Sequence, residues 1–382
     1  MKITKVETFK VVPRWLLLRI ETDDGYVGWG EPIVEGKAAT TEAAVHELSP
    51  LIMGKDPRRV EDIWQTLYRG GFYRGGPVLS SAISGIDQAL WDIKAKALGV
   101  PVYECLGGPV RDKMEVYSWI NSTTPEEAAE SARKSIEAGF RKVKMFGVDA
   151  VGWINDNREI DKLLAKLQAI RDAVGNDLGI AIDFHARPHK AMAKTLLKQI
   201  EPFSILFVEE PVLVENEEAF AELHSCTSIP LATGERSFTR WDFKNMLQKG
   251  YVDIIQPDLS HAGGISEVRR IAAMAEAYDV ALAPHCPLGP IAFAACLQID
   301  FTCINACIQE QSQGMAYNKG QEMAQYVKDP SIFAFKDGYI PLLTEPGLGI
   351  EVNEESIREM AKVGHTWKNP ILYHEDGSVV EW

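Results

Sequence analysis

The chain has 382 residues, of which 46% are hydrophobic and 25% charged, and its formal net charge is −14. This composition is ordinary for a globular protein, but the acidic balance argues against binding to nucleic acid or to an anionic membrane surface. The sequence has no apolar stretch of membrane-spanning length, no visible secretory signal and six cysteines without short paired spacing, so we expect a cytoplasmic protein with reduced thiols.

The N-terminal third predicts a small α+β domain. Three strand-like segments separated by turns predict an antiparallel meander: Ile3–Val12, Trp15–Thr22 and Tyr26–Gly30. Helical patterns then cover Thr41–Leu51 and Ser80–Leu98, the second ending at Gly99. Strands followed by helices predict an α+β capping domain over residues 1–112.

Alternating strands and helices begin near Met114–Ile120. Thr124 and Glu127 form a predicted capping box at the start of the first helix. The alternation stops after Glu310, so we expect a catalytic (β/α) barrel over residues 113–322 and a C-terminal segment, 323–382, that returns to the cap. The chain is longer than the roughly 250 residues of a bare barrel, which is consistent with a second domain.

Three apolar, strand-like runs each end in an acid. Asp183, Glu209 and Glu235 are each 26 residues apart, which is about the length of one strand, one helix and two loops. The next three runs also end in polar side chains, namely Asp258, His285 and Glu310. The C-terminal ends of barrel strands lie together, so these side chains should share one site.

Three carboxylates brought together repel one another, and each loses solvation. A bound divalent cation resolves both problems, and oxygen ligands without a thiolate favour a hard ion, Mg²⁺. The alternative is that the acids form ion pairs with loop arginines such as Arg236.

Two long motifs carry a family resemblance. Ile180, Asp183, His185, Ala193, Ile200 and Val208–Pro211 resemble one signature of the mandelate racemase/muconate lactonizing enzyme subgroup of the enolase superfamily, and Ala82–Gly107 resembles another, with Cys105 in place of its usual leucine. The resemblance implies an α/β fold: a modified TIM barrel of seven βα units plus a closing strand, under an α+β capping domain. It also implies that Asp183, Glu209 and Glu235 are the Mg²⁺ ligands.

Within the subgroup the resemblance is strongest to the galactonate dehydratases. It rests on five segments, Phe72–Pro77, Asp183–His185, Gln256–Gly264, Ala283–Pro290 and Gln309–Ser312. It implies a hydro-lyase that converts D-galactonate to 2-dehydro-3-deoxy-D-galactonate by abstraction of the C2 proton, a Mg²⁺-stabilised enediolate and loss of the 3-hydroxyl. The partner is then a small sugar acid, and we expect a homo-oligomer.

The two histidines divide the predicted chemistry. Because Asp258 ends the strand before His285, it can orient the imidazole and raise its proton affinity, which favours His285 as the base. His185 lies two residues after Asp183 and therefore points the same way, so it can protonate the leaving hydroxyl; the alternative is a partner of the metal ligands. By resemblance, a protonated Glu310 would hydrogen-bond the substrate carboxylate, the alternative being a salt bridge.

The remaining predictions concern substrate contacts and competing functions. Lys144 and Tyr73 are predicted to bind substrate. The loops Glu31–Thr40 and Gly70–Val78 are predicted to determine which hydroxyl stereochemistry is accepted and to close over the substrate. Lys142 and Lys144 superficially match the paired lysines of racemases in the subgroup, but the resemblance puts Phe146 at the second lysine's place. Three alternatives stay open: a dehydratase of another aldonate (gluconate-type), a racemase or epimerase, and a non-catalytic metal-binding interaction protein.

Overall fold

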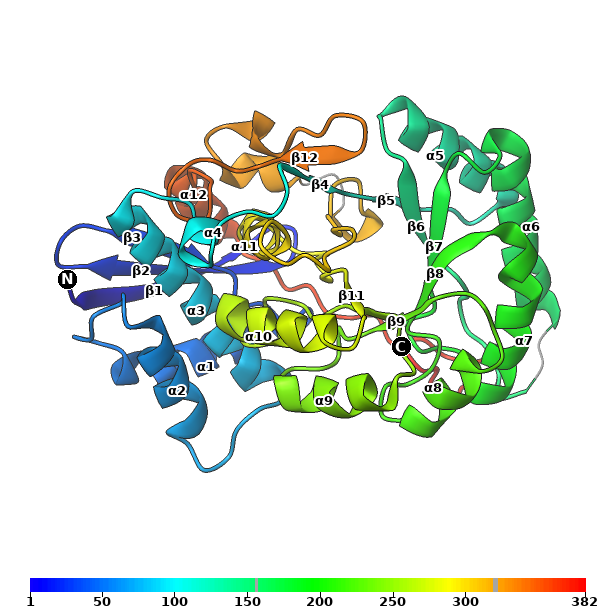
Figure 1. Cartoon of the computed structure of the whole chain (residues 1–382), viewed down its shortest axis with the longest axis horizontal. Coiled ribbons are helices and arrows are strands. Elements are labelled where there is room, and N and C mark those ends of the chain that lie inside the picture. The colour runs from blue at the N-terminus through cyan, green and yellow to red at the C-terminus, as the bar shows by residue number, and fades with distance from the viewer. Residues whose placement is uncertain (155–156, 319–321) are drawn as a thin grey trace.

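The structure, a computed structural model, describes residues 1–154, 157–318 and 322–382. Its cap lies beside the barrel (Figure 1). The strands are β1 (Ile3–Val11), β2 (Trp15–Thr22), β3 (Val27–Gly30), β4 (Lys113–Glu115), β5 (Ser118–Ile120), β6 (Lys142–Phe146), β7 (Gly179–Asp183), β8 (Ile205–Glu209), β9 (Leu231–Thr233), β10 (Ile254–Ile255), β11 (Ala281–Leu282) and β12 (Tyr339–Pro341). The α-helices are α1 (Ala38–Leu48), α2 (Val60–Arg69), α3 (Pro77–Leu98), α4 (Val102–Cys105), α5 (Pro125–Glu137), α6 (Asn157–Val174), α7 (Lys190–Ile200), α8 (Glu217–His224), α9 (Arg240–Lys249), α10 (Gly264–Glu276), α11 (Pro290–Asp300) and α12 (Glu354–Val363).

Seven parallel strands, each followed by a helix, form the barrel. Their order in the sheet is β5 to β11, the same as their order in the sequence. The sheet closes through residues 306–309, where Leu282 bridges to Ala306 and Val116 bridges to Gln309. The predicted modified barrel of seven βα units is therefore confirmed, but the closing segment forms isolated bridges rather than a continuous strand.

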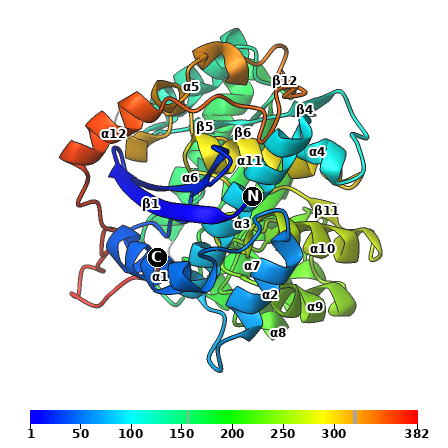
Figure 2. The same ribbon diagram turned by 90° about the vertical axis from the view of Figure 1, so that its left-hand side faces the viewer.

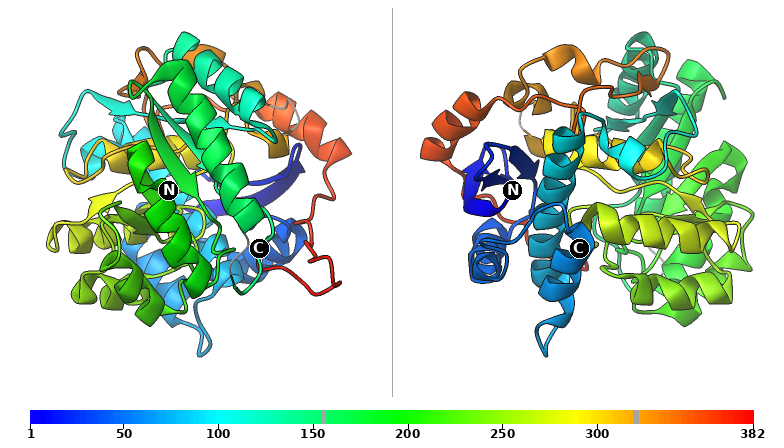
Figure 3. Two further views of the ribbon diagram at one scale, coloured as in Figure 1. Left: turned by 90° about the vertical axis from the view of Figure 1, so that its right-hand side faces the viewer. Right: turned by 60° about the vertical axis from the view of Figure 1, so that its left-hand side comes forward.

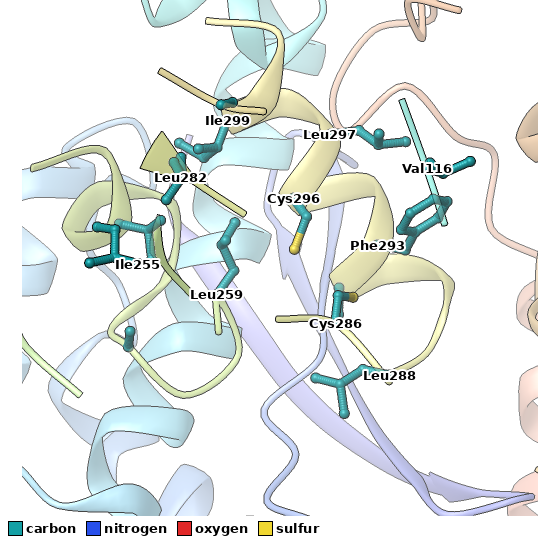
Figure 4. Close-up of a cluster of buried hydrophobic side chains, with 14 of the residues drawn as sticks. Val116, Ile255, Leu259, Leu282, Cys286, Leu288, Phe293, Cys296, Leu297 and Ile299 are labelled. Atoms are coloured by element: carbon teal, nitrogen blue, oxygen red, sulfur yellow. The ribbon is translucent and has the colours of Figure 1, made fainter. Parts of the chain in front are cut away.

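Side chains from successive strands fill the barrel interior. Seven buried residues around the sheet form one interior cluster, namely Tyr117, Ala181, Phe207, Ala232, Ile254, Ala283 and Ile308. The opposite faces of the strands pack under the surrounding helices. Figure 4 shows this packing beside α11, where Leu282 and Ile255 from β11 and β10 lie near Cys296 on the helix. Apolar side chains on both faces explain why the strands are apolar runs.

The predicted first barrel strand, Met114–Ile120, is divided between two sheets. β4 pairs antiparallel with β12, and only β5 joins the barrel. At Val116 the chain leaves the first pairing, and the amide of Val116 donates to the carbonyl of Gly338 at 2.8 Å. The apolar residues here predict a strand, but they cannot show that the distant strand β12 pairs with its first half.

The cap is a three-stranded antiparallel sheet packed on α3. β3 approaches this helix so closely that a Cβ on Gly30 would lie 1.9 Å from the carbonyl oxygen of Gly85. The helix begins at Pro77, earlier than predicted, because proline is favoured at the first helical position. It ends as predicted at Gly99, which is left-handed with φ 71°. Helix α2 was not predicted.

Buried contacts join the cap to the barrel. The carboxylate of Glu31 accepts hydrogen bonds from the amides of Gly289 and Ala292, at 2.7 and 3.0 Å, at the start of α11. Asp87 of α3 accepts from the amide of Ser266 on α10 at 3.0 Å. These contacts join the loop after β3 to α11, and α3 to α10.

The C-terminal segment also packs on the cap. Helix α12 lies beside β1 (Figures 2 and 3), and Arg19 of β2 pairs with Glu354 at 3.2 Å. The domain boundaries at 112 and 322 remain predictions. Among the described residues, none of the helices has the length and apolar character needed to cross a membrane.

Candidate active site

The three acids predicted as metal ligands lie together at the C-terminal end of the barrel. Asp183 and Glu209 are the last residues of β7 and β8, and Glu235 lies two residues after β9. One oxygen from each carboxylate lies within 4.8 Å of the other two. An all-oxygen donor set of this kind fits a hard divalent cation. Glu235 Oε2 is buried without a hydrogen-bond partner among the described residues, so it is available as a ligand.

A buried lysine supports this cluster from β6. Lys144 Nζ lies 2.8 Å from both carboxylate oxygens of Glu209 and 2.9 Å from Glu310 Oε1. Burial opposes the charge on Lys144, but the two carboxylates outweigh it and raise the pKa well above its usual range. In this arrangement the Lys144 ammonium faces Glu209 and Glu310 rather than the cavity, so the substrate contact predicted for it remains untested.

His285 is paired with Asp258 as predicted. His285 Nδ1 lies 2.8 Å from Asp258 Oδ2, and the backbones of the two residues form an isolated parallel β-bridge. A proton on Nδ1 directed at Asp258 leaves Nε2 toward the carboxylates, 3.6 Å from Glu235. Burial lowers the pKa of His285, but Glu235 and Glu310 outweigh it and raise the pKa well above its usual range. The ring therefore has a strong affinity for a proton.

His185 lies on the other side of the carboxylates. It follows β7, whereas His285 follows β11, and the sheet order places β8, β9 and β10 between them. His185 Nε2 is 2.9 Å from Asp183 Oδ2, and the His185 amide donates to Asp183 Oδ1 at 2.8 Å. Its φ of 48° is left-handed, which is uncommon for a residue other than glycine. The contact with Asp183 is compatible with both roles predicted for His185.

Glu310 is held as an acceptor. Its carboxylate accepts from the indole of Trp119 at 3.1 Å and from the amide of Cys286 at 2.8 Å, in addition to its contact with Lys144. Burial raises the pKa of Glu310, but the charges of Lys144 and His285 outweigh it and lower the pKa. Glu310 is thus an ionised salt-bridge partner here, and it would need a proton before it could donate to a substrate carboxylate.

A cavity of about 360 Å³ opens above these residues. Its walls include His185, Glu235 and His285 from the barrel, and Val34 and Glu35 from the first predicted cap loop. The second predicted loop contributes Pro77 alone among the described residues.

Tyr73 does not line this cavity. Its side chain is 87% exposed on the loop between α2 and α3, which projects from the cap (Figure 1). The substrate contact predicted for Tyr73 would therefore require that loop to move, and it remains a prediction.

Several cavity residues were not predicted because no strand-end pattern marks them. Arg14 is buried, donates to the carbonyl of Pro287 at 2.8 Å and lies over the rings of Tyr317 and Trp367, at 5.5 and 5.1 Å. These aromatic residues, together with Asn369, Glu381 and Trp382, come from segments after the barrel strands. These residues lie far from the strand-end motifs in the sequence, so the sequence alone does not indicate that they belong to the site.

His261 was assigned no role from the sequence, and the structure places it between the cap and the predicted base. Its Nε2 lies 3.2 Å from Glu35 of the cap loop and 3.6 Å from Asp258. Burial lowers the pKa of His261, but the two carboxylates outweigh it and raise the pKa to about 9. The cap loop is thus linked by charge to the pair formed by Asp258 and His285.

The fold and the acidic cluster define the class of protein. Residues 2–107 match the profile of the mandelate racemase / muconate lactonizing enzyme N-terminal domain, and residues 127–356 match that of the enolase C-terminal domain-like family. The chain belongs to the mandelate racemase/muconate lactonizing enzyme group of the enolase superfamily, whose members bind a divalent metal.

Individual relatives cover the whole chain. It is 56% identical over 382 residues to a D-galactonate dehydratase of Pectobacterium atrosepticum and 54% identical over 382 residues to one of Ralstonia pickettii, with all of each protein covered. Among solved structures, an enolase from Agrobacterium radiobacter with bound Na and L-malate superimposes with a TM-score of 0.91 at 33% identity, covering 100% of both chains.

Proposed function

We propose that the protein is a Mg²⁺-dependent dehydratase that converts D-galactonate to 2-dehydro-3-deoxy-D-galactonate and water. The observation that carries the proposal is that two histidines lining one cavity lie on either side of a cluster of three carboxylates, of which Glu235 also lines the cavity. The full-length relatives named D-galactonate dehydratase support the choice of substrate. A homo-oligomeric state and a cytoplasmic location remain predictions.

Asp183, Glu209 and Glu235 would hold the metal. A bound Mg²⁺ supplies positive charge that stabilises the negative charge developing on the substrate carboxylate. Lys144 holds Glu209 in place through contacts with both carboxylate oxygens, and its charge neutralises part of the negative charge of the three carboxylates.

The two histidines would then move the protons. His285 Nε2 takes the proton from C2 while Asp258 fixes the ring through Nδ1. His185 gives a proton to the 3-hydroxyl as the bond from C3 to oxygen breaks, and water leaves. The resulting enol tautomerises to the 2-keto-3-deoxy acid, so the net change is loss of one water from the sugar acid.

A panel of aldonates tests the substrate assignment. Incubated with Mg²⁺, the protein should release keto acid from D-galactonate faster than from gluconate and from the other C2 to C5 epimers. The measurement is the rate of keto-acid formation for each compound. Faster turnover of another aldonate would replace galactonate in the proposal, and exchange of the C2 proton without any keto acid would indicate a racemase or epimerase.

Removal of one metal ligand should strongly reduce both Mg²⁺ binding and activity. Glu235→Gln tests the metal ligand more specifically than Glu209→Gln does. Glu209 also pairs with buried Lys144, so its substitution would disturb the fold as well. We expect Glu235→Gln to weaken Mg²⁺ binding and activity on the order of 100-fold or more. Titration calorimetry and keto-acid release measure the two effects.

Exhaustive EDTA treatment of the unmodified protein is the matching control. It should remove activity, and Mg²⁺ should restore it. Full activity after EDTA would refute the requirement for a metal.

The cap loops should become protected when substrate binds. Loop residues Val34 and Glu35 already line the cavity, and Pro77 marks the end of the more exposed loop. Closure over the site would exclude water and strengthen its electrostatic interactions. Hydrogen exchange of residues 31–40 and 70–78 should slow with a bound aldonate analogue, while exchange in helix α12, which lies beside β1 and does not line the cavity, stays the same. Unchanged exchange in both loops would count against closure.

A further inference from the structure

The last residues of the sequence reach the cavity from outside the barrel. After α12 the chain leaves the cap and forms a hairpin in which Tyr373 bridges to Val379 and the amide of Val380 donates to the carbonyl of Leu372 at 2.9 Å. Val380 is buried, which fixes the end of the hairpin. Trp382 then lies at the barrel near β9 (Figure 1) and lines the cavity.

One guanidinium group joins Trp382 to the predicted acid. Arg236 Nη2 donates to the backbone oxygen of Trp382 at 2.7 Å and to the carbonyl oxygen of His185 at 2.9 Å. Arg236 itself is held by Glu210, with Nε 3.5 Å from the carboxylate. The backbones of Trp382 and His185 are therefore tied to the same nitrogen, next to the metal ligand Glu235.

The side chains of the two residues are also neighbours. The His185 ring centroid lies 5.3 Å from that of Trp382, with the rings tilted by 33°, and 5.0 Å from that of Phe146, tilted by 50°. The Arg187 guanidinium lies 5.8 Å from the Trp382 ring centroid. The indole thus has the imidazole beside it and a cation near it, and both limit its movement.

We propose that Trp382 is a positioning residue for His185, holding the imidazole at the angle from which it protonates the leaving 3-hydroxyl. The inference rests on the proposed function and on the assignment of His185 as the acid. A displacement of about 1 Å in a reacting group can cost on the order of 100-fold in rate. Because Trp382 contacts His185 and not His285 in the interactions above, its loss should affect the departure of the hydroxyl and spare abstraction at C2.

The test compares Trp382→Ala, Trp382→Phe and Val379→Ala with the unmodified protein. Val379 is 66% exposed on the same hairpin and does not line the active-site cavity, so it controls for disturbance of the segment. Each protein is incubated with D-galactonate and Mg²⁺ in D₂O, and NMR follows both keto-acid formation and deuterium at C2 of the remaining substrate.

We expect Trp382→Ala to form keto acid roughly 10 to 100-fold more slowly while C2 exchange continues, so that the ratio of exchange to dehydration rises. Trp382→Phe, which keeps an aromatic ring, should recover most of the rate, and Val379→Ala should match the unmodified protein. Unchanged dehydration in Trp382→Ala, or an equal fall of exchange and dehydration in both Trp382 variants, would overturn the inference. If the unmodified protein itself forms no keto acid, the proposed function fails instead.

Discussion

His285→Asn should lose both keto-acid formation and exchange of the C2 proton with solvent deuterium. Asparagine can still form a hydrogen bond with Asp258, but it offers no nitrogen that accepts a proton at neutral pH. Since both measured processes begin with abstraction at C2, both should fall on the order of 10² to 10⁴-fold. Proton NMR in D₂O measures exchange and product in one sample.

His224→Asn is the matched control for this substitution. His224 lies at the end of α8, is partly exposed and does not line the cavity. It should therefore behave as the unmodified protein, with a melting temperature close to that of His285→Asn. Retention of C2 exchange in His285→Asn would show that another group is the base.

His185→Asn should lose keto-acid formation but retain exchange at C2. The base His285 stays paired with Asp258 on the other side of the carboxylates, so the proton can still leave C2 and return from solvent. Departure of the 3-hydroxyl without its proton donor should slow on the order of 10² to 10⁴-fold. The same NMR measurement separates the two processes.

Two outcomes would contradict this division of labour. If His185→Asn dehydrates galactonate at nearly the unmodified rate, His285 serves both steps and His185 is a partner of the metal ligand Asp183. If His185→Asn loses C2 exchange while His285→Asn keeps it, the roles of the two histidines are reversed.

The centre of the site could be predicted from the sequence because residues at the ends of successive barrel strands are regularly spaced in the sequence and lie close together in the fold. Asp183 and Glu209 end β7 and β8, Glu235 lies two residues after β9, and parallel strands end on the same side of the barrel. The same reasoning placed Asp258 beside His285, and the two residues are indeed hydrogen-bonded at 2.8 Å. Capping at Thr124 and the stop of α3 at Gly99 were predictable because both depend on neighbouring residues alone.

The rest of the site depends on contacts that no local pattern contains. Arg14 comes from the turn between β1 and β2 and Trp382 from the end of the sequence, yet both line the cavity. The ionised state of Glu310 follows from the charges of Lys144 and His285, and Lys144 lies on β6, far from Glu310 in the sequence. The division of residues 113–120 between β4 and β5 likewise depends on the distant strand β12.

The most direct test of the account is NMR of D-galactonate incubated with the unmodified protein and Mg²⁺ in D₂O. The account predicts conversion to the 2-keto-3-deoxy acid with one solvent deuterium at C3, and no reaction when Mg²⁺ is chelated. Galactonate recovered with deuterium at C2 and no keto acid, or galactonate left unchanged in the presence of Mg²⁺, would contradict it.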